Sequence, residues 1–150
     1  MYTLEDKINI NCSYKELYDK LLYFFQNTEN YKEWHNDHIE CKWIKGKDFE
    51  IGSILYASEI LNNKIHKLKF RIIENDNTTK LKYKILFPYS IICENGSFNM
   101  IKKENLTEFV ATLNFKLPTF FVKLFNGEIN ALRQHVKEEG ISIKEIIESK

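Results

Sequence analysis

Strict alternation of apolar and polar side chains is the feature that most constrains the fold of this chain. In the run KLKYKILF, residues 80–87, the apolar Leu81, Tyr83, Ile85 and Phe87 alternate with lysines and one leucine. Successive side chains of a β-strand point to opposite faces, so such a run predicts a strand with one covered and one solvated face. Comparable runs occupy residues 39–46, 53–61, 64–73, 91–101 and 106–115. Six such strands in succession predict an antiparallel sheet.

Shorter signals define what precedes this sheet. Residues 3–11 include alternating Ile8 and Ile10 near their end, which predicts a first strand. Residues 12–27 follow, with Ser13 and Glu16 spaced as a capping box and apolar residues at helical intervals, which predicts a helix. Residues 28–38 predict a second, short helix. Asn62-Asn63 separates two of the predicted strands and predicts a tight hairpin.

The C-terminal segment predicts one long helix from Pro118 to Gly140, because proline suits a first turn and glycine a C-cap. Residues that recur every three or four positions form a stripe on it, and His135 and Glu139 lie one turn apart at its lower end. If the upper part of the stripe packs on the sheet, these two side chains also point at the sheet. The stripe consists of Phe121, Leu124 or Phe125, Glu128, Leu132, His135 and Glu139.

Composition limits the classes of function. The 150 residues predict a single domain over residues 1–150, and the net charge of +1, without a basic stripe, argues against a nucleic-acid partner. Eleven Phe, eight Tyr and two Trp indicate a bulky core or a cavity lined with rings. Three widely spaced cysteines without a CxxC pair predict free thiols. Because neither a signal peptide nor an apolar run of about 20 residues occurs, we expect a cytoplasmic protein without a membrane partner.

The order strand, two helices, six strands, long helix resembles the helix-grip fold of the START-like, or SRPBCC, superfamily. This resemblance implies an α+β protein in which a curved antiparallel sheet of about seven strands surrounds a long C-terminal helix and encloses a cavity. Three short segments are similar to the diacetylphloroglucinol (DAPG) hydrolase group, namely WHNDH, GSILYASEI and HVKEEG.

That resemblance implies a metal site of two histidines and two glutamates. Carried over by position, the ligands are His135, Glu139, Glu59 and a histidine of WHNDH, where we prefer His38 and keep His35 as the alternate. Zn²⁺ is the expected metal, with Mn²⁺ or Fe²⁺ as alternatives. The residues alone leave Glu59 open, because both faces of its strand are largely apolar and surface exposure is an even alternative.

Two functions follow from this resemblance. The first is a metal-dependent, DAPG hydrolase-like protein in which metal-bound water attacks the carbonyl of a small acylated aromatic or ketone. No catalytic residue beyond the metal ligands is assigned. The alternative is a non-enzymatic carrier of a small hydrophobic ligand. His66 is expected to be a satisfied core histidine, and the homodimer is left open as an assembly. The candidates to contact the ligand are Trp34, Trp43, Tyr56 and Tyr83.

Overall fold

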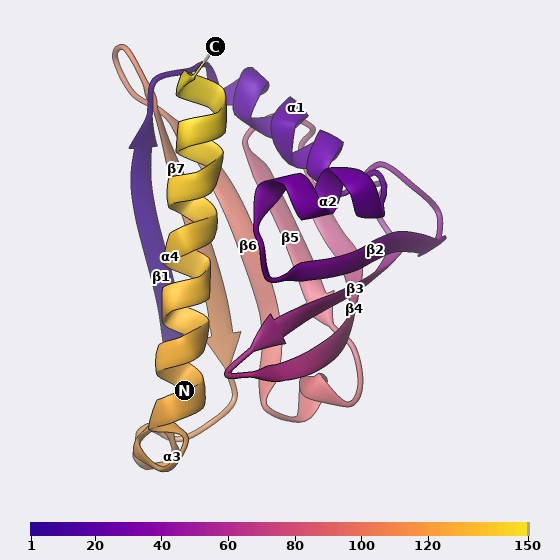
Figure 1. Ribbon diagram of the computed structural model, residues 1–150, viewed down its shortest axis with the longest axis vertical. Coiled ribbons are helices and arrows are strands. Elements are labelled where there is room, and N and C mark those ends of the chain that lie inside the picture. The colour runs from indigo at the N-terminus through magenta and orange to yellow at the C-terminus, as the bar shows by residue number, and fades with distance from the viewer. Residues whose placement is uncertain (150) are drawn as a thin grey trace.

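The computed structural model describes residues 1–149 and contains one seven-stranded antiparallel sheet (Figure 1). The strand order is β1-β7-β6-β5-β4-β3-β2, so β2 to β7 form a meander and β1 pairs with β7. This confirms the six consecutive strands predicted from the alternation. The strands are β1 (Tyr2–Ile10), β2 (His38–Lys45), β3 (Ile54–Leu61), β4 (Lys64–Asn75), β5 (Lys80–Ile85), β6 (Cys93–Lys102) and β7 (Thr107–Phe115).

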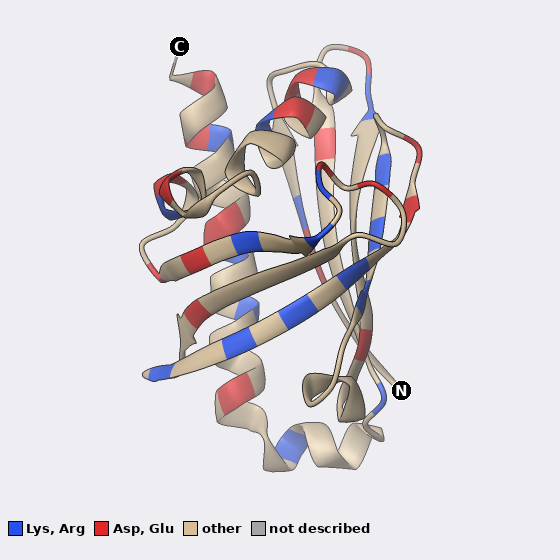
Figure 2. Ribbon diagram, turned by 90° about the vertical axis from the view of Figure 1, so that its right-hand side faces the viewer, with Lys and Arg blue, Asp and Glu red and all other residues tan. Residues whose placement is uncertain are grey.

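The two faces of the sheet differ as the alternation requires. On β4 the side chains of Lys67, Lys69 and Arg71 are exposed, and they form a row of basic residues on the outer face (Figure 2). Their neighbours Leu68 and Phe70 turn to the inner face and line a cavity. Asn62 and Asn63 join β3 to β4 with positive φ angles of 52° and 63°, the conformation of a tight hairpin turn.

Two short helices lie between β1 and β2. Helix α1 (Tyr14–Phe24) begins where the Ser13 hydroxyl oxygen accepts a hydrogen bond from the Glu16 N–H, as the capping box predicted. Helix α2 (Thr28–Trp34) is shorter than predicted, because the backbone turns extended at His35 and His38 already belongs to β2. Both helices pack near one end of the sheet (Figure 1).

The C-terminal segment forms two helices where one was predicted. Helix α3 (Thr119–Leu124) ends at Phe125, and helix α4 (Asn126–Glu148) runs along β1 and β7 (Figure 1). Leu124 and Phe125 are exposed at this break, so the upper part of the predicted stripe does not pack on the sheet. The exposed Glu128 lies in the first turn of α4, outside the cavity.

Gly140 was predicted to end the helix, and this was wrong. Helix α4 continues past it because Ile143 and Ile147 extend the buried face. A Cβ at Gly140 would lie 3.3 Å from Asp6 Oδ2 and 3.4 Å from Ile8 Cγ2. The glycine therefore allows the helix to approach β1 closely, which is a packing role and not a capping role.

Three further predictions from the sequence can be compared with the structure. Phe87 does not continue the inner face of β5, because the strand ends at Ile85 and the Phe87 side chain is exposed. Cys41 and Cys93 are buried free thiols, as predicted, whereas Cys12 is only partly buried. Among the helices of residues 1–149, none is both long and apolar enough to cross a membrane.

Candidate metal centre and cavity

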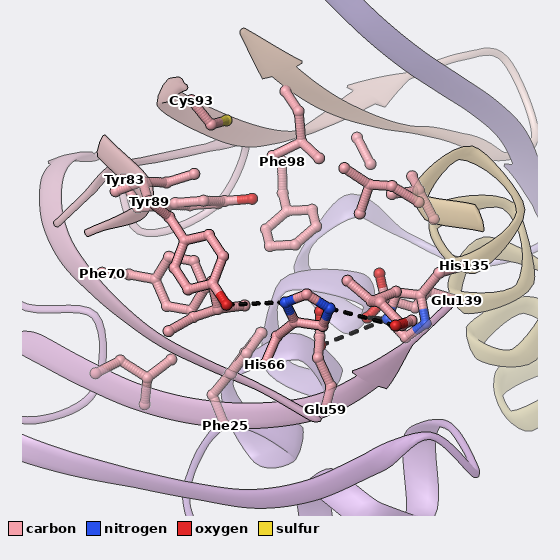
Figure 3. A pocket seen from close by; sticks show the side chains of 18 of the residues that line it. Phe25, Glu59, His66, Phe70, Tyr83, Tyr89, Cys93, Phe98, His135 and Glu139 are labelled. Carbon is pink, nitrogen blue, oxygen red and sulfur yellow. Dashed lines mark hydrogen bonds and ion pairs between the residues drawn. The ribbon is translucent and has the colours of Figure 1, made fainter. Parts of the chain in front are cut away.

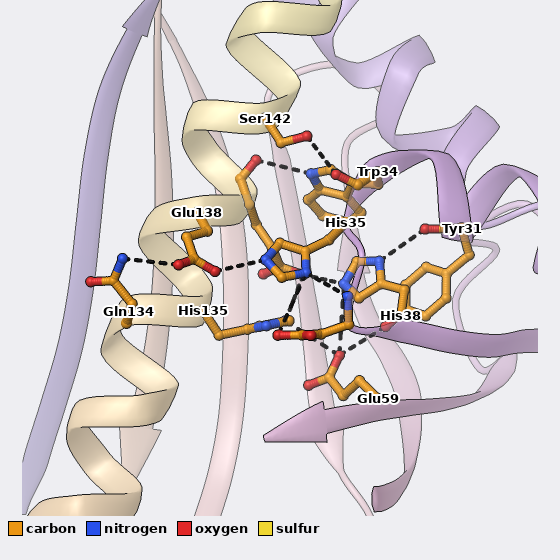
Figure 4. Close-up of polar contacts among 11 residues, drawn as sticks. Tyr31, Trp34, His35, His38, Glu59, Gln134, His135, Glu138 and Ser142 are labelled. Atoms are coloured by element: carbon orange, nitrogen blue, oxygen red, sulfur yellow. Dashed lines mark hydrogen bonds and ion pairs between the residues drawn. The ribbon is translucent and has the colours of Figure 1, made fainter. Parts of the chain in front are cut away.

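Four side chains predicted as metal ligands converge between the sheet and α4. His38 is the first residue of β2, Glu59 lies near the end of β3, and His135 projects from α4 (Figure 4). Glu139 projects from the same helix one turn further along (Figure 3). One potential ligand atom from each residue lies within 4.8 Å of the others. We call these four residues the His₂Glu₂ cluster. Their convergence is the arrangement that the resemblance implied, whereas their role as ligands stays a prediction.

Backbone pairing explains half of the cluster. His38 and Glu59 are register partners in the antiparallel β2–β3 ladder, so their side chains lie next to one another on one face. This register turns Glu59 inward, which settles the direction that the alternation left open. The other half follows from the helix, since His135 and Glu139 are separated by four residues and therefore by about one turn.

The distances within the cluster suit a small ion at its centre. Nε2 of His38 lies 2.8 Å from Oε2 of Glu139 and 3.8 Å from Oε2 of Glu59. Nε2 of His135 lies 3.3 Å and 3.5 Å from the same two oxygens. In a tetrahedral zinc site with bonds of about 2.0–2.1 Å, neighbouring ligand atoms are about 3.3 Å apart. The four separations scatter around this value.

The imidazole of His135 lacks the hydrogen bonds that a buried ring requires. The residue is only 4% exposed, and neither Nδ1 nor Nε2 has a hydrogen-bond partner among the described residues. The two carboxylates are near Nε2, but neither contact has hydrogen-bond geometry. Buried polar groups are rarely left unpaired, because burial without a partner costs free energy. A cation bound to Nε2 would provide the missing interaction.

The two carboxylates of the cluster favour a positive charge between them, either a protonated His135 ring or a metal ion. Burial opposes ionisation of Glu59 and Glu139, but the adjacent His135 outweighs it, so the pKa of each carboxyl lies below its usual range. Burial lowers the pKa of His135, whereas Glu139 and Glu59 together raise it to about 11. Two ionised carboxylates therefore hold a positive charge between them. Imidazole nitrogens and carboxylate oxygens are the donor set that Zn²⁺ accepts.

A second layer of contacts orients His38 and Glu59. The backbone carbonyl oxygen of Tyr31 lies 2.9 Å from Nδ1 of His38 and can only accept, so Nδ1 carries the hydrogen. The other nitrogen, Nε2, faces the cluster 2.8 Å from Oε2 of Glu139 and is the atom that a metal ion would bind. The Tyr31 ring stacks on the His38 ring at 3.8 Å, and its hydroxyl donates to Oε2 of Glu59 at 2.9 Å.

His35, the alternate to His38, lies beside the cluster and is not one of the four. Its Nδ1 accepts a hydrogen bond from the Asp37 N–H, and its Nε2 lies 2.9 Å from Oε1 of Glu138. Both nitrogens are thus engaged outside the His₂Glu₂ cluster. His35, Asp37 and His135 also bring potential ligand atoms within 4.8 Å of one another, with the His35 ring centroid 4.6 Å from that of His135. His35 therefore covers the outer side of the cluster.

A cavity of about 160 Å³ opens beside the cluster, between the inner face of the sheet and α4 (Figure 3). Glu59, His135 and Glu139 are part of its wall, and most of the remaining wall is apolar. A cavity of roughly 150 Å³ in another protein accommodates a benzene molecule, so this one is sized for a single aromatic ring. Five phenylalanines line it, namely Phe25, Phe49, Phe70, Phe98 and Phe115.

Of the four aromatic residues predicted to contact a ligand, Tyr83 lines the cavity and the others do not. Trp34 is fully buried behind the cluster, where its ring stacks on Phe24. Trp43 packs against Phe49 outside the cavity lining. Tyr56 alternates with inward-facing neighbours on β3, so it turns to the outer face, where Lys42 lies over its ring.

Two residues near the cavity were not recognised from the sequence. Tyr31 supports the cluster through its hydroxyl, although the sequence predicted only a short helix around it. Tyr89 lines the cavity and hydrogen-bonds His66, which is itself on the cavity wall and half-buried. Neither position carries a local signal, because both contacts join residues more than 20 positions apart.

No family model and no curated protein matches the chain. Solved structures do match. Ara h 8.0201 has a TM-score of 0.70 at 15% identity over 99% of each chain. Norcoclaurine synthase from Thalictrum flavum, in complex with dopamine and hydroxybenzaldehyde, has a TM-score of 0.75 at 10% identity over 99% of this chain and 87% of its own. The di-domain ARO/CYC protein BexL has a TM-score of 0.72 at 11% identity over 96% of this chain and 49% of its own. These likenesses show the helix-grip fold.

Proposed function

We propose that this protein binds a divalent metal ion, Zn²⁺ in the first instance, through His38, Glu59, His135 and Glu139. We further propose that it acts on a small acylated aromatic or ketone in the adjoining cavity. The observation that carries the proposal is the His135 imidazole, which is buried between two carboxylates without a hydrogen-bond partner among residues 1–149. Mn²⁺ and Fe²⁺ are the alternative ions for the same donor set.

The surroundings of the cluster support a reactive role. When bound, a zinc ion supplies Lewis acidity, which polarises a carbonyl oxygen and acidifies water. The chain itself contributes the orientation of the ligands, through the contacts of Tyr31 with His38 and Glu59. The mostly apolar walls lower the local dielectric, which strengthens electrostatic interactions inside the cavity.

The resemblance of WHNDH, GSILYASEI and HVKEEG to the DAPG hydrolase group supports carbon–carbon hydrolysis as the reaction. The cavity volume of about 160 Å³ supports a substrate with one aromatic ring. Norcoclaurine synthase, which shares the fold, was solved with dopamine and hydroxybenzaldehyde, so the fold accommodates small aromatic molecules in that protein.

A carrier of a small hydrophobic ligand is the second candidate, and the mostly apolar cavity wall favours it. The two candidates differ in what the His₂Glu₂ cluster does. A carrier binds its ligand with or without metal and releases it unchanged, whereas the hydrolase requires the metal and converts the ligand.

The first experiment is elemental analysis of tag-free protein by inductively coupled plasma mass spectrometry, after purification without chelator. We compare wild type with His135→Ala and Glu139→Gln, and we use Glu138→Gln as the matched control on the next residue of α4. Circular dichroism confirms that each variant is folded. We expect near-stoichiometric metal in wild type and Glu138→Gln, and a loss of at least about tenfold in the two cluster variants.

A wild type that is purified without metal and takes up no added Zn²⁺ contradicts the metal site and leaves the carrier. If metal binds, the metal-loaded protein is incubated with a panel of acylated phenols, and the products are followed by chromatography with mass detection. Metal-dependent loss of the acyl group supports the hydrolase. Binding without conversion of any compound in the panel supports the carrier.

A further inference from the structure

The cavity contains polar side chains outside the His₂Glu₂ cluster. Besides Tyr31, which contacts the cluster, they include His66, Tyr83 and Tyr89 on the cavity wall. His66 and Glu59 are register partners in the β3–β4 ladder, so their side chains lie next to one another on the inner face. Directly opposed residues have Cβ atoms about 4.5–5.5 Å apart. A molecule that meets Glu59 with one substituent can therefore reach the His66 side of the cavity with another.

The hydrogen bonds of His66 determine which atom carries the proton. Nε2 lies 3.2 Å from the backbone carbonyl oxygen of Leu61, which can only accept, so Nε2 donates. In the neutral ring Nδ1 is then an acceptor. The Tyr89 hydroxyl lies 2.8 Å from Nδ1 and donates its only hydrogen there. The Tyr89 oxygen therefore has no further hydrogen to donate, but its lone pairs can accept a hydrogen bond.

Tyr83 provides a hydrogen-bond donor, in contrast to the acceptor on Tyr89. Its hydroxyl has no hydrogen-bond partner among residues 1–149, and it points into the interior of the cavity toward Phe98 (Figure 3). Burial raises the pKa of this hydroxyl well above 10, so the oxygen keeps its hydrogen and can donate. The Tyr83 ring lies directly over Gly96, its register partner on β6, where any larger residue would overlap it. The glycine thus creates the space in which the Tyr83 ring is held.

We propose that Tyr89, oriented by His66, and Tyr83 form a second ligand-binding subsite beside the cluster, at which the ligand must present an O–H or N–H group. This inference rests on the proposed function, which places the ligand in the cavity with its carbonyl group toward the His₂Glu₂ cluster. A hydroxyl or amino substituent donates to the Tyr89 oxygen. An ether of the same shape has no hydrogen to donate, so it leaves the Tyr89 oxygen unpaired in an apolar wall.

The test compares ligands that differ only in this hydrogen. The metal-loaded protein is titrated by calorimetry with the 2-, 3- and 4-hydroxyacetophenones, the matching aminoacetophenones and the matching methoxyacetophenones. The three positional isomers sample different directions from the carbonyl. We expect at least one isomer whose hydroxyl and amino forms bind about tenfold more tightly than the methoxy form.

Three variants assign this preference to the subsite. Tyr89→Phe removes the acceptor, so the preference disappears. His66→Leu keeps the Tyr89 hydroxyl but removes the acceptor of its hydrogen. The hydroxyl can then donate to a methoxy oxygen, so the methoxy form binds more tightly and the difference in affinity between the hydroxyl and methoxy forms becomes smaller. Tyr56→Phe removes a similar hydroxyl from the outer face of β3 and leaves the preference unchanged. Metal content and the thermal midpoint of each variant show that the cluster and the fold are intact.

Equal binding of all members of every isomer set, or a preference that survives in Tyr89→Phe, overturns the subsite while leaving metal binding and cavity binding in place. Failure of every compound to bind overturns the subsite together with the proposed cavity ligand. A preference that is lost in Tyr89→Phe and narrowed in His66→Leu supports the assignment.

Discussion

The indole Nε1 of Trp34 donates a hydrogen bond of 2.9 Å to the backbone carbonyl oxygen of Glu139. This contact joins the end of α2 to the turn of α4 that carries two cluster residues. The hydroxyl of Ser142 returns a second hydrogen bond to the carbonyl oxygen of Trp34 (Figure 4). Since His38 follows α2 by only a few residues, these two bonds set the distance between His38 and Glu139.

We therefore expect Trp34→Phe to weaken both the fold and metal binding. The loss of the hydrogen bond and of buried volume should lower the free energy of unfolding by about 2 kcal/mol. Trp43→Phe is the matched control. The Trp43 Nε1 is buried without a hydrogen-bond partner among residues 1–149, so this substitution removes no hydrogen bond. Urea denaturation with and without Zn²⁺ measures both effects. Equal losses in the two variants would count against the role of the Trp34–Glu139 bond.

Tyr31→Phe tests the hydroxyl that donates to Glu59. Without it, the carboxylate loses an orienting partner, and contacts of this kind are worth about 10–100-fold in metal affinity. Tyr18→Phe removes another tyrosine hydroxyl, which is hydrogen-bonded to Asn75, away from the cluster. Competition with a chromophoric chelator gives the Zn²⁺ affinity of each variant. We expect Tyr18→Phe to bind Zn²⁺ as tightly as wild type does. A Tyr31→Phe variant with that same Zn²⁺ affinity would refute the orienting role of the Tyr31 hydroxyl.

Gly96→Ala tests the packing that holds Tyr83. A Cβ at Gly96 would overlap the hydroxyl and ring atoms of Tyr83, so the ring must move or the strands must separate. We expect a destabilisation of about 1–3 kcal/mol and weaker binding of cavity ligands. In α4, a Cβ added at Gly127 would meet nothing within 4 Å, so Gly127→Ala should be neutral or stabilising by up to about 1 kcal/mol. Thermal unfolding of both variants measures the change in stability. A Gly96→Ala variant as stable as wild type contradicts the packing role of Gly96.

Asp76 should make stability depend on pH. Partial burial raises the pKa of this carboxyl, but the Thr79 hydroxyl and the N–H groups of Thr78, Thr79 and Lys80 outweigh burial and hold the pKa well below its usual range. Because the folded pKa is lower than the unfolded pKa of about 3.9, the contribution is complete above that value. It is lost as the pH falls through the folded pKa.

The measurement for Asp76 is urea denaturation of wild type and Asp76→Asn at pH 7 and at pH values below 4. We expect Asp76→Asn to be less stable by about 1 kcal/mol at pH 7, as for other capping carboxylates, and the difference to shrink in acid. Asp19→Asn is the control, since Asp19 forms an exposed ion pair with Lys15. A difference that stays constant from pH 7 into acid would show that the charge of Asp76 is not the cause.

Several features of the site were predictable because they depend on local geometry. The four-residue spacing of His135 and Glu139 places both on one face wherever a helix forms. The alternation in residues 80–85 separates Leu81 and Tyr83 from the lysines wherever a strand forms. The end of α4 was less predictable, because Gly140 is typical of a C-cap and only its contact with β1 explains why the helix continues.

The sequence by itself determined the order of the strands, the faces of strands with clean alternation such as β5, and the pair on the last helix, since the backbone repeats of strand and helix are properties of adjacent residues. Only the tertiary structure decided that Glu59 faces inward and that His38, rather than His35, joins the cluster. Those outcomes depend on the β2–β3 register and on where α2 ends. They also depend on the approach of α4 to the sheet, which brings His38 to Glu139 across 101 positions of the chain. Such contacts result from packing of the whole domain, which no short stretch of sequence encodes.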